Sequence, residues 1–102
     1  MVESTTIRSL EDIRRLRPQI MTLARQCRAR KVSVFGSCVR GDMRADSDID
    51  FLVDFDEEYS LLDHAGLLVG LEDLLGCKVD VVPRRALRPF LRDTVIREAQ
   101  EL

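Results

Sequence analysis

Apolar and acidic residues alternate regularly along positions 48 to 55. The odd positions are all apolar: Ile49, Phe51, Val53 and Phe55. The even positions are acidic except for one leucine: Asp48, Asp50, Leu52 and Asp54. Because successive side chains of a strand point to opposite faces, this stretch predicts a strand with one apolar face and one largely acidic face.

Two shorter stretches, one before and one after this segment, also predict strands. Lys31 to Phe35 is rich in β-branched residues and ends at Gly36. Lys78 to Val82 is an apolar run interrupted by Asp80, and Pro83 closes it because proline cannot donate to a strand ladder.

Four further segments predict helices, which begin at Leu10, Pro18, Leu61 and near Pro89. The first and third follow a serine with an aspartate three residues later, the pattern of a capping box. Proline suits the first turn of a helix, where its missing N–H costs nothing. We expect the third helix to end at Gly76 and the last to end at about Arg97.

These elements predict an α/β fold, with a small mixed β-sheet of three or four strands flanked by helices. The sheet cannot be purely parallel, because the connection from Phe35 to Asp48 is too short for a full crossover helix. With 102 residues, we expect one domain spanning residues 1–102.

Composition argues against several classes of protein. A net charge of −2 gives no basic footprint for general nucleic-acid binding. No apolar run approaches the length of a membrane span, and the N-terminal residues lack the pattern of a secretory signal. The three cysteines form no CxxC pattern, so we expect reduced thiols in a cytoplasm, without a zinc site or a disulfide framework.

Three features suit chemistry on a phosphate. Gly36-Ser37 follows a strand directly, and a helical turn starting at Cys38 would aim free N–H groups at an anion. Asp48 and Asp50 leave the same face of the predicted strand, and paired oxygen ligands suit magnesium. Asp80 would complete a cluster of three carboxylates if its strand lies next to theirs. These are the parts of an in-line phosphoryl or nucleotidyl transfer.

Simpler interpretations of the acids remain open. Asp48 and Asp50 could belong to a solvated loop, and Asp80 could point to solvent from an edge strand. The spacing of an EF-hand calcium loop is also present, with its acids at Asp46, Asp48, Asp50 and Glu57. Phe51 stands where that loop needs glycine, so we do not expect a calcium site.

We expect no catalytic role for the arginines near the C-terminus, for His64 or for Cys38. The arginines near the C-terminus form a basic stripe that we interpret as a solvated helical face: Arg84, Arg85, Arg88 and Arg92. We favour that interpretation over contact with an acidic partner or a nucleotide phosphate. His64 is expected to be exposed or partly packed on its helix, and nothing identifies Cys38 as a nucleophile.

The segment GSCVRGDMRADSDID, residues 36–50, resembles the signature of the DNA-polymerase-β-like nucleotidyltransferase superfamily, which is Gly-Ser, ten residues, then Asp-x-Asp. The Arg40-Gly41 pair and the Ser-Asp-x-Asp before a hydrophobic strand resemble its minimal nucleotidyltransferase branch. That branch includes antitoxins paired with HEPN-domain ribonucleases. The resemblance extends over nearly the whole chain.

The resemblance implies a nucleotidyltransferase fold and a role for each matching residue. The expected catalytic and metal-binding residues are Asp48, Asp50 and Asp80, with Asp80 also the base. The expected nucleotide phosphate-binding residues are Gly36, Ser37 and Arg40. For Arg40, a purely structural role in shaping the turn remains equally open.

The resemblance also implies an activity. It is the magnesium-dependent transfer of a nucleoside monophosphate, usually AMP from ATP, to a hydroxyl, with two magnesium ions bound. In antitoxin members of type VII-like systems, the acceptor is a tyrosine of the partner HEPN toxin, so a hetero-oligomer or dimer is expected.

Two alternatives remain open. One is a non-catalytic antitoxin that neutralises its partner by occlusion, and the other is a subunit that modifies a small molecule. The length of the chain argues against a second domain and favours an acceptor held by another subunit or protein.

Overall fold

The computed structural model describes residues 7, 9–42, 44 and 47–102. Its helices are α1 (Leu10–Arg15), α2 (Arg17–Gln26), α3 (Ser37–Arg40), α4 (Leu61–Leu75) and α5 (Pro89–Glu98). Its strands are β1 (Ala29–Phe35), β2 (Ile49–Phe55), β3 (Val79–Pro83) and β4 (Gln100–Glu101). A single 3-10 turn, η1 (Arg84–Ala86), follows β3 in the described part of the chain.

The four strands form one sheet in the order β3-β2-β1-β4. Strand β1 is antiparallel to both β2 and β4, whereas β2 is parallel to β3. The predicted α/β fold with a mixed sheet is therefore confirmed. The segment between β1 and β2 holds only the short α3, while α4 supplies the full crossover that two parallel strands need.

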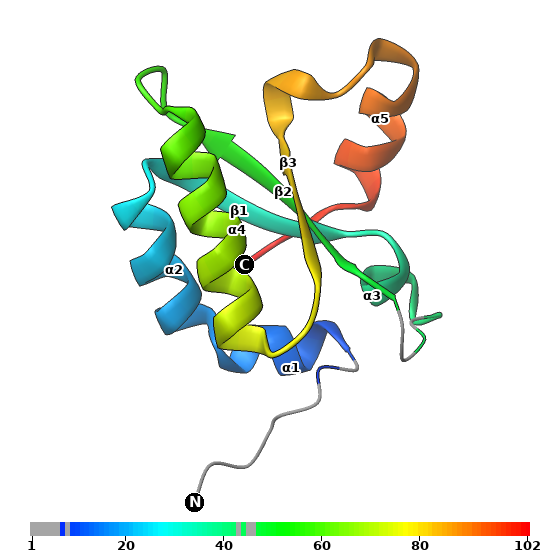
Figure 1. Cartoon of the computed structure of the whole chain (residues 1–102). Helices are drawn as coiled ribbons and strands as arrows, with labels where there is room; N and C mark the ends of the chain where they lie inside the picture. The colour runs from blue at the N-terminus through cyan, green and yellow to red at the C-terminus, as the bar shows by residue number, and fades with distance from the viewer. Residues whose placement is uncertain (1–6, 8, 43, 45–46) are drawn as a thin grey trace, which may run out of the picture.

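The two faces of the sheet differ as the alternation of residues predicts. Helices α1, α2 and α4 gather on one side of the strands, and α5 stands apart from them (Figure 1). The most buried side chains of β1 and β2 are 0–1% exposed and form the core: Val32, Val34, Ile49, Phe51 and Val53. On the acidic face, Asp50 and Asp54 are only half-buried. That face is consequently available for chemistry.

Helix boundaries follow from local chemistry. At the start of α4, the Ser60 hydroxyl accepts the N–H of Asp63, and the Asp63 carboxylate accepts the N–H of Ser60, which confirms the capping box. Gly76 ends α4 in a left-handed conformation with φ +70°. Helix α2 begins at Arg17, one residue before the predicted start, because proline is tolerated throughout the first turn. None of the described helices has both the length and the apolar character needed to cross a membrane.

Candidate active site

The three predicted carboxylates lie at one end of β2 and β3. In the parallel pairing of these strands, Asp50 stands opposite Asp80. Asp80 is exposed on β3, and Asp48 is exposed immediately before β2 rather than within it. The structure therefore brings Asp50 and Asp80 side by side on neighbouring strands, with Asp48 two residues before Asp50 along the chain.

Asp50 is the half-buried member of this group. Burial raises the pKa of Asp50 above its ordinary value, and the nearby charges of Asp80 and Asp48 raise that pKa further. The charge of Arg40 lowers the pKa of Asp50, and the charge of Glu98 raises it by a smaller amount. A carboxylate held among like charges is electrostatically strained, and binding a cation relieves that strain.

The donor chemistry of the three acids fits magnesium. Among the described residues, no group of three or more His, Cys, Asp or Glu side chains is already arranged to hold a metal ion. Magnesium does not require a preformed protein cage, because it usually binds through one or two carboxylates, water and substrate phosphates. Asp50 and Asp80 are carboxylates of that kind, and Asp48 is the third.

Gly36 connects the end of β1 to the candidate metal site. It has φ +81° and ψ −152°, a conformation that side chains with a Cβ avoid. A Cβ built at Gly36 would collide with the Oδ2 of Asp50. Glycine is therefore required both by the turn and by the approach of the Asp50 carboxylate to the backbone.

The predicted phosphate-binding turn begins at this glycine. Helix α3 starts at Ser37, one residue earlier than expected, and Gly36 is its N-cap. The N–H groups at the start of a helix have no partner within it, so they are donors for an anion. Arg40 lies in the last turn of α3, and Gly41 ends the helix with φ +83°.

Glu98 is a residue of this site that sequence reasoning missed. Its Oε1 accepts the backbone N–H of Gly36, and its two carboxylate oxygens lie 3.0 and 3.3 Å from Nη1 of Arg40. The hydrogen bond with Glu98, followed by its charge, raises the pKa of Arg40. Only the pairing of β4 with β1 could have revealed this contact, because Glu98 is 62 residues from Gly36 in sequence.

Cys38 and His64, which were considered from the sequence, take no part in this arrangement. Cys38 is 4% exposed, and burial raises the pKa of its thiol, which disfavours a nucleophilic thiolate. The ring of His64 lies against that of Phe55, with centroids 5.9 Å apart, so His64 is packed as expected. Asp42 pairs with Arg40 at 3.5 Å. Asp46 lies outside the described residues.

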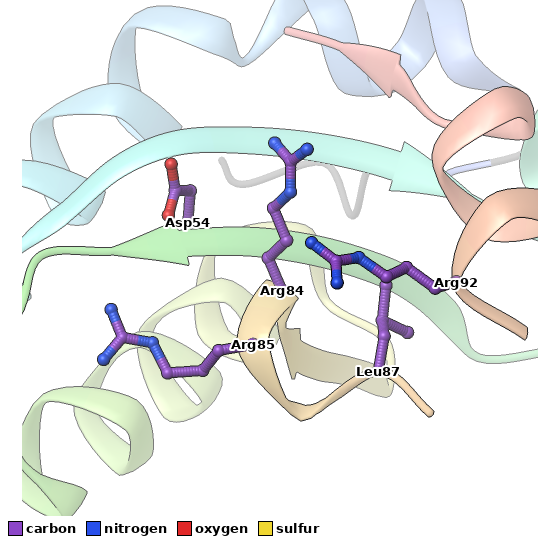
Figure 2. Close-up of a pocket in the computed structure, with 5 residues that line it drawn as sticks. All are labelled: Asp54, Arg84, Arg85, Leu87 and Arg92. Carbon is purple, nitrogen blue, oxygen red and sulfur yellow. The ribbon is translucent and has the colours of Figure 1, made fainter. Parts of the chain in front are cut away.

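A second polar feature lies at the other end of β2. A pocket of about 310 Å³ is lined by Asp54, Arg84, Arg85, Leu87 and Arg92. Figure 2 shows Arg85 extending away from Arg84 and Arg92, and Arg85 donates to the carbonyl of Phe55 at 3.2 Å. Neither Arg84 nor Arg92 forms an ion pair within the described part of the chain. The predicted solvated stripe is thus partly a basic pocket.

Comparison with known proteins agrees with the fold and the signature. The nucleotidyltransferase domain family matches residues 13–102. Protein adenylyltransferase MntA of Thermococcus cleftensis is 49% identical over 69 residues, which cover 68% of this chain and 70% of that protein. A solved minimal nucleotidyltransferase has a TM-score of 0.83 at 49% identity and covers 92% of this chain and 96% of its own.

A more distant structure shares the fold alone. It is a chain from the complex of a tri-AMPylated Shewanella oneidensis HEPN toxin with an MNT antitoxin, with a TM-score of 0.64 and 21% identity. The match covers 86% of this chain and 69% of the other. Together, the family match and the similar proteins confirm the family and the enzyme class expected from the signature. The chain belongs to the nucleotidyltransferase domain family, as a minimal nucleotidyltransferase.

Proposed function

We propose that this nucleotidyltransferase is a magnesium-dependent protein adenylyltransferase that acts as an antitoxin in the cytoplasm. It transfers AMP from ATP to a tyrosine hydroxyl of a partner HEPN toxin. Its 49% identity to protein adenylyltransferase MntA supports AMP as the transferred group and a protein as the acceptor. The signature in residues 36–50 supports the partner class.

One observation carries the proposal. Asp50 stands opposite Asp80 in parallel register, and the Asp50 carboxylate lies against the Gly36 backbone. A nucleotide whose β- and γ-phosphates lie at the α3 turn would therefore have its α-phosphate close to these acids. A solvated acidic loop needs no such approach between a carboxylate and a glycine.

The residues divide the reaction between them. Gly36 and Ser37 hold the phosphates through the start of α3, and Asp48 and Asp50 hold the metal. Magnesium, when bound, neutralises the triphosphate and stabilises the leaving pyrophosphate. Holding the acceptor and the α-phosphate in line is itself a major part of catalysis.

The bond changes follow from this arrangement. The acceptor oxygen attacks the α-phosphorus, the bond from that phosphorus to the oxygen bridging the α- and β-phosphates breaks, and pyrophosphate leaves with the electron pair. The hydroxyl proton passes to the carboxylate of Asp80. Asp80 suits this role because it is exposed on an edge strand, where a protein acceptor can reach it.

The test is co-expression with the protein encoded by the neighbouring gene, followed by intact-mass measurement of that protein. Wild type should increase the partner's mass by one or more AMP units, and Asp48→Asn should abolish the increase. Asp54→Asn is the matched control, because Asp54 lies on the same strand but lines the arginine pocket. Its product should equal that of wild type.

Two results would contradict the proposal. An unmodified partner that stays bound and silenced would favour neutralisation by occlusion. Transfer of AMP to a small molecule, with the partner left unmodified, would favour the small-molecule alternative.

A further inference from the structure

The carboxylate of Glu98 occupies the place where a nucleotide phosphate is expected. It accepts the N–H of Gly36 and forms an ion pair with Arg40 at 3.0 Å. Both partners belong to the predicted phosphate-binding set. A carboxylate and a phosphate oxygen are both anionic acceptors, and charge-assisted hydrogen bonds of this kind are the strong ones.

The sheet explains how Glu98 reaches this position. In the antiparallel pairing of β4 with β1, Ser33 stands opposite Glu101 and Val34 opposite Gln100. Continuing this register by two residues along each strand brings Glu98 opposite Gly36. The short strand β4 therefore delivers the Glu98 side chain to the first residue of the phosphate-binding turn.

Glu98 and a triphosphate cannot both bind the Gly36 N–H. The Gly36 N–H is a single donor, and a phosphate at that position would stand beside the Glu98 carboxylate as a like charge. Binding of the nucleotide phosphates at Gly36 therefore requires Glu98 to leave.

Helix α5 is built so that Glu98 can leave at small cost. No residue of α5 is buried, and Phe90 and Leu91 are 74% and 46% exposed. Moving a helix that buries little apolar surface forfeits little hydrophobic stabilisation. In Figure 1, α5 also stands apart from the helices that cover the core.

We propose that Glu98 is an internal substitute for the nucleotide phosphate. In the free protein its carboxylate fills the phosphate site formed by the Gly36 N–H and Arg40, here called the seat, and a triphosphate displaces it on binding. The inference rests on the proposed function, because it assumes that this seat receives ATP. It adds a regulatory contact: α5 and β4 set the apparent affinity for the nucleotide. An interaction that keeps α5 away from α3 raises the apparent affinity for the nucleotide, and one that keeps α5 against α3 lowers it.

The test measures phosphate binding directly, without metal or acceptor. Inorganic tripolyphosphate is titrated into magnesium-free protein by isothermal calorimetry, with wild type, Glu98→Gln and Glu98→Ala compared at one ionic strength. Removing the competitor should tighten binding roughly three- to tenfold, because the apparent affinity is reduced by the fraction of protein whose seat is free. Glu101→Gln is the charge-matched control, and it should change binding less than about twofold, since Glu101 is exposed on β4, where solvent screens its charge.

Three other outcomes of the titration would contradict the inference. Weaker binding by Glu98→Gln would overturn the inference and make Glu98 a positioning residue for Arg40. Equal changes in Glu98→Gln and Glu101→Gln would reduce the effect to general charge. If no variant binds tripolyphosphate, the seat does not take phosphate and the inference fails. The proposed function is tested separately, by the transfer of AMP to the partner protein.

A second measurement uses wild type alone, so it does not depend on a variant that folds. Amide hydrogen exchange is recorded with and without tripolyphosphate. Displacement of Glu98 should accelerate the exchange of amides in α5, including Arg92, whose N–H is bonded to the carbonyl of Arg88 at 2.9 Å. Unchanged or slower exchange in α5 at saturating tripolyphosphate would contradict displacement.

Discussion

Gly36 is the residue on which the geometry of the site depends most directly. It combines a positive φ with contact between its backbone and the carboxylate of Asp50. Gly41, five residues later, has a similar φ of +83°, but a Cβ placed there meets nothing within 4 Å. Comparing alanine substitutions at the two glycines therefore distinguishes the cost of backbone strain from the cost of steric collision.

We predict that Gly36→Ala lowers the free energy of unfolding by roughly 2–4 kcal/mol, because strain and collision add. Gly41→Ala should cost only about 1 kcal/mol, the strain of a left-handed residue. Urea denaturation of both variants measures the difference. Equal costs would show that the Asp50 carboxylate moves aside freely, and Gly36 would then be required only for its backbone conformation.

The stability of the protein should depend on pH through Asp50. Its pKa is raised in the folded protein by burial and then by Asp80 and Asp48, so folding disfavours its charged form. At pH values above both its folded and unfolded pKa, the ionised carboxylate therefore lowers stability. That penalty disappears as the pH falls through the folded pKa to below the ordinary value of 3.8.

Asp50→Asn should consequently stabilise the metal-free protein at pH 7 by up to about 1 kcal/mol, and the gain should fade on acidification. Magnesium should raise the melting temperature of wild type more than that of Asp50→Asn. Thermal melts across pH, with and without magnesium, measure both effects. A destabilised Asp50→Asn at pH 7 would mean that the carboxylate is compensated by contacts other than those with its like charges.

The residues of the site that lie in one local motif could be predicted from the sequence. Gly36, Ser37 and the Asp48–Asp50 pair follow from one signature and from strand alternation. Asp80 depended on the neighbouring position of two strands, which the structure shows. Glu98 could not be predicted, because its contact crosses 62 residues and depends on a strand of only two residues.

Among the elements, α4 packs against α2 with two glycines, Gly66 and Gly70, on its surface. A Cβ at Gly70 would lie 2.6 Å from Cδ2 and 2.8 Å from Cδ1 of Leu23 in α2. A Cβ at Gly66, one turn earlier, would lie 3.6 Å from Sγ of Cys27, an ordinary contact. The same helix therefore carries one crowded glycine and one with room.

We predict opposite effects for alanine at these two positions. Gly66→Ala should stabilise the protein by roughly 0.5–1 kcal/mol through helix propensity. Gly70→Ala gains the same propensity but must displace Leu23, and overpacking typically costs 1–3 kcal/mol, so a net loss of about 1 kcal/mol is expected. Chemical denaturation of the pair measures this, and stabilisation by both substitutions would show that Leu23 adapts without cost.

The elements were predicted well because each has a local signal. The alternation in β2, the capping box at Ser60 and Gly76 at the end of α4 are all read within a few residues. The pairing of β4 with β1 has no such signal, because two residues show no alternation. Only the return of the chain to the sheet after α5 determines where that strand pairs.

For the whole molecule, stability is distributed unevenly. The described core joins β1, β2 and β3 to α1, α2 and α4, whereas α5 buries no residue. Its end is held by the contacts of Glu98 and by the pairing of β4. The part of the protein that touches the predicted phosphate-binding turn is thus less firmly packed than the part that positions the acids.

We predict that the amides of α5 exchange at least about tenfold faster than those in the middle of β2, because α5 can open without disrupting the core. Glu98→Gln should accelerate the exchange of α5 further, while β2 stays unchanged. Hydrogen exchange read by mass spectrometry at peptide level measures both. Protection of α5 equal to that of β2 would show that the helix opens only when the whole protein unfolds.

The position of β3 has a practical consequence for handling the protein. This strand forms one edge of the sheet, and an exposed edge invites pairing with the strand of another molecule. Asp80, exposed on that edge, and Pro83, which lacks an N–H, discourage such pairing. A neutral residue at position 80 would therefore remove the charge that discourages aggregation at this edge, together with the proposed base. Asp48, exposed before its strand, is the better choice for an inactive protein that must stay in solution.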